Sequence, residues 1–161
     1  MLTLISVFLG FALTGAGITD LVMVREKQEF IEWLDYQCRH LETELTEASD
    51  AAVQNDVRAG PGNTSLQVEL EIKARSVEEW VRAAKGVDWP ARDRDLVAAM
   101  VGNAEVIAAM VSRRAEAVTG GISETASRHQ FESYWTAGER FEEAASAYGT
   151  KRCDQEVFLS D

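Results

Sequence analysis

The first 24 residues, MLTLISVFLGFALTGAGITDLVMV, constrain this chain most, because Asp20 is their only charged side chain. A segment this apolar must be kept away from water. At about 1.5 Å per residue it is also long enough to cross a hydrocarbon core of about 30 Å. We therefore expect residues 1–24 to form a retained transmembrane helix that makes this a single-pass membrane protein.

Two other interpretations of this segment stay open. A cleaved signal peptide normally has a basic start, whereas no basic side chain precedes the apolar run here, and the run continues past Ala16 to Val24. A soluble core helix can also be apolar, but few small domains contain a helix that is hydrophobic on every side. Both comparisons favour the transmembrane helix.

One face of the expected helix is made of small residues. At 100° per residue, five of them fall within an arc of about 80°: Thr3, Ser6, Gly10, Thr14 and Gly17. Small side chains allow a second helix to approach closely, and hydroxyl groups can form hydrogen bonds across the contact. We expect this face to pack against other membrane proteins or other copies of the chain within the lipid bilayer.

Charge bears on both orientation and partners. Arg25, Lys27 and Arg39 follow the apolar segment, and the positive-inside rule then favours a cytoplasmic body. The chain has a net charge of −11, and omitting Asp20 with the first segment leaves −10. A body this acidic is repelled by phosphate backbones. Nucleic acid is therefore not an expected partner.

Residues 25–58 are predicted to continue the first helix as a stalk. Their apolar residues alternate at spacings of three and four, as in a coiled coil: Ile31, Leu34, Cys38, Leu41, Leu45, Ala48 and Ala52. This stalk seam is short for an independent coiled coil. Packing against the later helices of the same chain is as reasonable as pairing with a second copy.

Residues 59–149 are predicted to form a helical bundle. After a Gly- and Pro-rich loop at 59–65, residues 66–72 alternate as in a strand, but their good helix formers favour a helix. Ser76 and Glu79 form a capping pair that suggests a new helix start there. The segment 91–119 has the rhythm of a core-facing helix, and Gly120 and Gly121 end it.

The last predicted helix is rich in aromatic residues, and Gly149 is placed to end it. Its apolar residues are expected to share one face: Phe131, Tyr134, Trp135, Phe141, Ala145 and Tyr148. Core packing explains most of them, whereas Tyr134 and Trp135 are also candidates for a protein interface. Residues 150–161 form a C-terminal tail without periodicity. The expected fold is all-α, an antiparallel bundle of three to four helices on a membrane-anchored stalk.

The chain has two cysteines, Cys38 and Cys153. In an oxidising compartment they can pair with each other or across subunits, whereas in a reducing cytoplasm they stay free. Cys38 lies on the stalk seam and suits a small buried position. Cys153 lies in the polar tail, which makes it the better candidate for a contact between molecules.

No pattern in the sequence predicts catalysis, and we expect no catalytic residue, no cofactor and no metal site. The only histidines, His40 and His129, lack a standard zinc spacing, and Glu-x-x-His pairs do not occur. The glycines of 59–65 precede no phosphate-binding lysine. The glutamates are interpreted as solvated helix faces.

The sequence therefore favours a non-enzymatic function. The leading hypothesis is a single-pass accessory or scaffold subunit of a larger membrane-associated assembly, such as a virion or an energy-transducing complex. The alternative is an envelope-spanning protein with an extracytoplasmic helical body, such as a spanin-like lysis or stress protein. The two differ in the side of the membrane on which the body lies.

Overall fold

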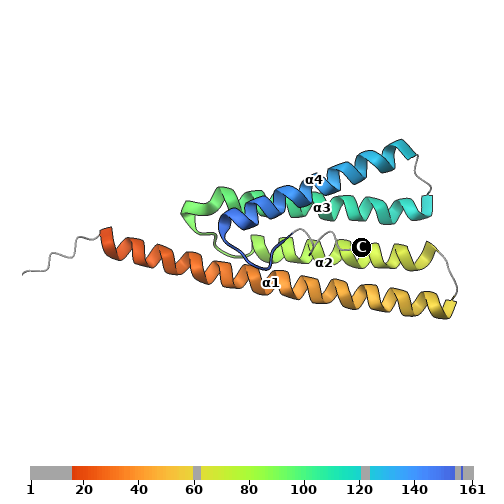
Figure 1. Ribbon diagram of the computed structural model, residues 1–161, viewed down its shortest axis with the longest axis horizontal. Helices are drawn as coiled ribbons and strands as arrows, with labels where there is room; N and C mark the ends of the chain where they lie inside the picture. The colour runs from red at the N-terminus through yellow and green to blue at the C-terminus, as the bar shows by residue number, and fades with distance from the viewer. Residues whose placement is uncertain (1–15, 60–62, 121–123, 155–156, 158–161) are drawn as a thin grey trace, which may run out of the picture.

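The computed structural model describes residues 16–59, 63–120, 124–154 and 157 (Figure 1). Over these residues the regular secondary structure is entirely helical, which confirms the all-α prediction. The elements are α1 (Ala16–Ala59), α2 (Asn63–Lys85), a 3-10 turn η1 (Ala91–Asp93), α3 (Arg94–Gly120) and α4 (Glu124–Tyr148).

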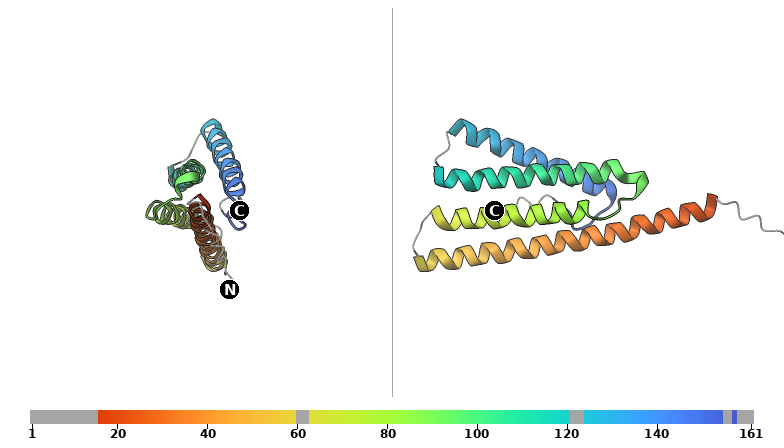
Figure 2. Two further views of the ribbon diagram at one scale, coloured as in Figure 1. Left: turned by 90° about the vertical axis from the view of Figure 1, so that its left-hand side faces the viewer. Right: turned by 180° about the vertical axis from the view of Figure 1, so that it is seen from behind.

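Successive helices run antiparallel, and α1 extends past the other three at its N-terminal end (Figure 1). The end-on view shows the four helices around a common interior (Figure 2). Helix α2 packs against both α1 and α3, and α3 also packs along α4. The predicted bundle of residues 59–149 thus supplies three helices, and the predicted stalk supplies the fourth.

The stalk seam forms part of this core. Leu34 and Cys38 are fully buried, and Leu41 and Leu45 are nearly so. They belong to the same hydrophobic cluster as the buried residues of α2, α3 and α4. Of the two options for the seam, the structure therefore shows packing within the chain. Residues 25–58 and 59–149 therefore share one core, and α1 runs unbroken from Ala16 to Ala59.

Helix α2 differs from its prediction at Ser76. Residues 66–72 are helical, as favoured, but the helix continues through Ser76 to Lys85 without a new start. Ala74 and Val77 on either side of Ser76 are buried in the core. A capping pair acts only where the chain enters a helix, and here core packing holds both flanks in one helix. The predicted restart was wrong.

Helix α3 packs against both α2 and α4 and is the most apolar of the described helices. Within the described residues, Ala91–Val118 is the one helical stretch long and apolar enough to cross a membrane by length and composition alone. The core helix of a bundle meets the same criteria. Val97, Ala104 and Ile107 are completely buried between neighbouring helices. We therefore interpret α3 as a core helix.

Helix α4 ends at Tyr148, and Gly149 is the residue that allows the chain to turn back. Gly149 has a φ of 102°, a conformation that residues with a Cβ rarely adopt. The backbone N–H groups of Gly149 and Thr150 both donate to the carbonyl of Ala145, at 3.0 and 3.1 Å. The predicted helix end is confirmed, and the chain then crosses back to α1.

Candidate interaction surfaces

The predicted small-residue face is not tested by the structure. Thr3, Ser6, Gly10 and Thr14 lie outside the described residues. Gly17 lies in the first turn of α1, where the surroundings of the residues are also not described. Packing of this face against other helices remains a prediction.

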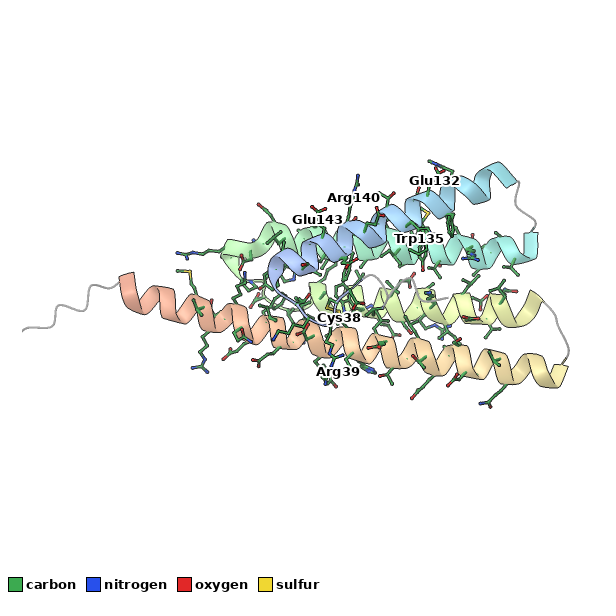
Figure 3. The ribbon with its side chains drawn as sticks, in the orientation of Figure 1. Cys38, Arg39, Glu132, Trp135, Arg140 and Glu143 are labelled. Carbon is green, nitrogen blue, oxygen red and sulfur yellow. A yellow bond between two sulfur atoms is a disulfide. The ribbon has the colours of Figure 1, made fainter. Side chains whose placement is uncertain are left out.

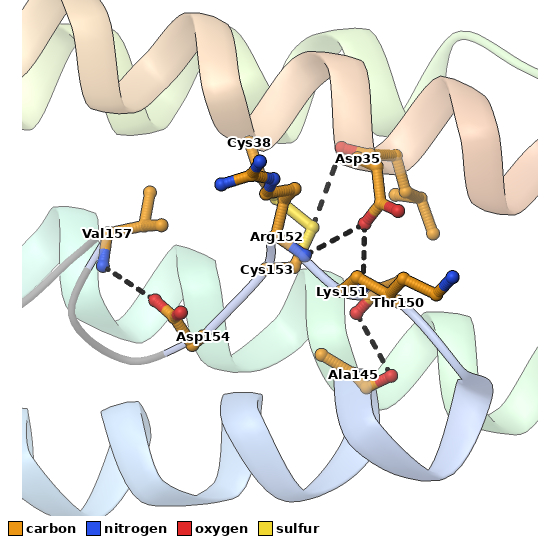
Figure 4. Close-up of a disulfide and its surroundings, with 10 residues drawn as sticks. Asp35, Cys38, Ala145, Thr150, Lys151, Arg152, Cys153, Asp154 and Val157 are labelled. Carbon is orange, nitrogen blue, oxygen red and sulfur yellow. Dashed lines mark hydrogen bonds between the residues drawn. A yellow bond between two sulfur atoms is a disulfide. The ribbon is translucent and has the colours of Figure 1, made fainter.

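The two cysteines form a disulfide within the chain, between α1 and the C-terminal tail (Figure 4). The Cα atoms of Cys38 and Cys153 are 5.3 Å apart, within the usual range for a disulfide. Cys153 is only 4% exposed. The expectation that Cys153 contacts another molecule was wrong, because residues 149–154 fold back onto α1 and bury the sulfur. No other cysteine is available for pairing.

An aspartate on α1 holds the same segment. The side chain of Asp35 accepts hydrogen bonds from the backbone N–H groups of Lys151 and Arg152, at 2.8 and 3.0 Å (Figure 4). Farther along, Val157 is buried in the core cluster. We call the disulfide, these two hydrogen bonds and Val157 the tail clamp. No local sequence pattern indicates this role of Asp35, because its partners are backbone groups more than 100 residues away.

The aromatic face predicted for α4 separates into two parts. Phe141, Ala145 and Tyr148 are buried, as expected for core residues. In contrast, Phe131 is 53% exposed and Trp135 is 38% exposed. At 100° per residue, Phe131 and Trp135 lie about 80° and 120° from Phe141 around the helix, away from the centre of its buried side. The prediction of one shared face was wrong for these two residues.

The exposed aromatic residues contact each other and form a patch, which we call the α4 aromatic patch. The ring centroids of Phe131 and Trp135 are 5.8 Å apart, and those of Tyr134 and Trp135 are 6.5 Å apart. Tyr134 is the half-buried member of the patch and packs against the core cluster. The structure thus brings together the two predicted interface residues Tyr134 and Trp135 and adds Phe131.

A polar cluster missed by the sequence analysis joins α1, η1 and α4. The ammonium group of Lys27 lies 3.3 Å from a carboxylate oxygen of Asp93 and 4.6 Å from the centroid of the Tyr148 ring. Tyr148 is 1% exposed, and its hydroxyl has no hydrogen-bond partner among the described residues. Burial, together with the negative charge of Asp93, raises the pKa of Tyr148 to about 12.

The raised pKa limits what this cluster can do chemically. A phenol with a pKa of about 12 keeps its proton at physiological pH, so Tyr148 is neither a base nor a nucleophile there. Lys27 already interacts with both Asp93 and the aromatic ring, which suits a structural contact between α1 and α4. In the described part of the chain, no three His, Cys, Asp or Glu side chains are grouped to hold a metal ion.

The geometry defines the class of protein as an all-α bundle closed by a disulfide, with an exposed aromatic patch on one helix. The chain matches no protein-family model, no curated protein and no solved structure. The function of the chain is therefore inferred from its own residues.

Proposed function

We propose that this protein is a non-catalytic, single-pass membrane-anchored protein that binds other proteins and holds its helical body on the oxidising side of the membrane. The observation that carries this proposal is the tail clamp, in which Cys38 and Cys153 close the body covalently. The apolar segment 1–24 provides the anchor, and the α4 aromatic patch provides a surface for partners.

The last part of the apolar segment and the body share one helix. Helix α1 contains the last part of the apolar segment, from Ala16 to Val24, and continues into the core. Met23 and Val24 line a shallow hollow together with Pro90 and Ala91 of the α2–α3 connection. If the membrane ends near Val24, this end of the bundle rests against the headgroups. The body then extends about 50 Å from the membrane along α1.

The disulfide supports an extracytoplasmic body. Disulfides persist in oxidising compartments and are rare in the cytosol, where thiols are kept reduced. The basic residues Arg25 and Lys27 favour the opposite side under the positive-inside rule, in which the neighbouring acidic residues count for little. We give the buried covalent pair more weight than this small charge asymmetry. This orientation corresponds to an envelope-spanning protein, such as a lysis or stress protein, rather than to a cytoplasmic accessory subunit.

The redox state of the cysteines in cells tests the orientation. Membranes containing the full chain are denatured in SDS with a maleimide–polyethylene glycol reagent, with or without prior reduction. We expect no mass shift before reduction and a shift of two adducts after it. Modification of both thiols without reduction would place the body in the cytoplasm. That result would favour the accessory-subunit hypothesis over the extracytoplasmic one.

Purification in mild detergent tests the binding function. We expect the native protein to elute with other membrane proteins, and Gly10→Leu to weaken that association because the larger side chain blocks close helix approach. Ala12→Leu is the matched control, since residue 12 lies about 160° from residue 10 on the helix. A solitary monomer that Gly10→Leu leaves unchanged would contradict the proposal.

A further inference from the structure

One side of α4, outside the buried core, carries an unusual combination of residues. Between positions 131 and 146, six residues fall within an arc of about 100°: Phe131, Glu132, Trp135, Glu139, Glu142 and Ser146. All are exposed except Glu142, which is half-buried. Between these positions the arc contains two aromatic rings and three carboxylates, and Arg128 lies on the same arc one turn earlier. We call these six residues the α4 stripe.

Glu132, Glu139 and Glu142 form no ion pair with any side chain that the structure describes. Glu132 lines a hollow together with His129 and Arg140. Figure 3 shows Glu132, Arg140 and Glu143 projecting from the outer side of α4, and Trp135 on the side nearer α3 in that view. Arg140 lies about 140° from Trp135 around the helix and therefore outside the stripe.

We propose that the α4 stripe binds a basic amphipathic helix of another protein. The aromatic rings of Phe131 and Trp135 would contact its apolar residues, and the carboxylates would pair with its Arg or Lys side chains. A cation placed over the Trp135 ring gains a further attraction from the negative face of the indole. Like charges disfavour an acidic partner, so charge complementarity selects a basic one.

This inference deepens the proposed function, on which it rests, by naming the class of partner. In Figure 1, α4 begins at the end of the bundle opposite the start of α1, so the aromatic end of the stripe lies far from the first turn of α1. A membrane-anchored body would therefore present this patch to proteins located away from its own membrane.

A peptide-binding experiment on the full chain tests the proposal. The chain is held in nanodiscs of neutral phosphatidylcholine, with empty nanodiscs as the blank. The probe is a fluorescein-labelled alanine-based helix that carries three arginines and two leucines on one face. Its anisotropy is compared with that of a peptide in which glutamates replace the arginines. We expect only the basic peptide to bind.

Two pairs of matched variants locate the binding site. Trp135→Ala is expected to weaken binding at least about tenfold, as for an aromatic residue at an interface centre, whereas Tyr36→Ala should leave it unchanged. Tyr36 is a suitable control because it is 60% exposed on α1. Replacing Glu132, Glu139 and Glu142 with Gln should weaken binding more than replacing three exposed glutamates elsewhere, namely Glu47, Glu78 and Glu79.

The results separate this inference from the proposed function. Absence of binding, or an equal effect of both sets of glutamate variants, would overturn the α4 stripe as a docking surface. Neither result concerns the redox state of Cys38 and Cys153 or the effect of Gly10→Leu. The anchored, extracytoplasmic body is therefore tested independently.

Discussion

The two halves of α4 contain similar side chains in different surroundings. In the C-terminal half, Phe141 contacts Trp80 of α2 with ring centroids 5.6 Å apart, and Tyr148 contacts Phe30 of α1 at 5.9 Å. In the N-terminal half, the rings of Phe131 and Trp135 contact each other and remain exposed. An aromatic residue on a helix therefore does not reveal its own role. The helices packed beside it decide whether it stabilises the fold or remains available to a partner.

The largest expected effect compares the two phenylalanines directly. Phe141→Ala should lower the free energy of unfolding by about 3–5 kcal/mol, because the side chain is fully buried and its loss leaves a cavity. Phe131→Ala should change it by less than about 1 kcal/mol. Urea unfolding followed by circular dichroism measures both. Equal effects would mean that the N-terminal half of α4 is as tightly packed as the C-terminal half.

The disulfide provides the second test. Replacing Cys38 and Cys153 with Ser should cost about 2–5 kcal/mol, because the bond closes a long loop and restricts the unfolded chain. Thermal unfolding with and without a reductant measures the loss in the native protein. The reductant should have no effect on the double variant. A native protein whose unfolding temperature does not respond to reduction would show that the clamp does not stabilise the body.

Asp35→Ala should lower the free energy of unfolding less than loss of the disulfide, although both changes affect the tail clamp. Asp35→Ala removes the acceptor of two backbone hydrogen bonds and should cost about 1–2 kcal/mol. Asp50→Ala is the matched control, since Asp50 is an exposed acid on the same helix and should change stability by less than about 0.5 kcal/mol. Hydrogen exchange should increase at Lys151 and Arg152 only in the Asp35 variant. Unchanged exchange there would contradict the clamp.

Among these variants, Tyr148→Phe is expected to change the free energy of unfolding least at neutral pH. The pKa of Tyr148 is raised from 10.0 to about 12 in the folded state, so the folded protein holds this proton more tightly than the unfolded chain. Stability should therefore fall as the pH rises from 10 to 12, and this component should be missing in Tyr148→Phe. Unfolding measured in urea at several pH values gives the two slopes. Identical slopes would contradict the raised pKa.

Much of the fold could be predicted from the sequence. The spacing of Leu34, Cys38 and Leu41 identified the buried side of α1, and Gly149 identified the end of α4. These signals are local, because helical periodicity and a glycine at a helix end act within a few residues. The candidate site was predicted only in part. Tyr134 and Trp135 were singled out, but the exposure of Phe131 depends on how α4 lies against its neighbours.

The sequence by itself determined that this chain is helical, acidic and apolar at its N-terminal end, because composition and periodicity require no knowledge of distant contacts. Only the tertiary structure decided that α2 continues through Ser76, that Cys38 pairs with Cys153, and that the face predicted for α4 divides into buried and exposed parts. Each of these depends on residues that are far apart along the chain and meet only when the helices pack.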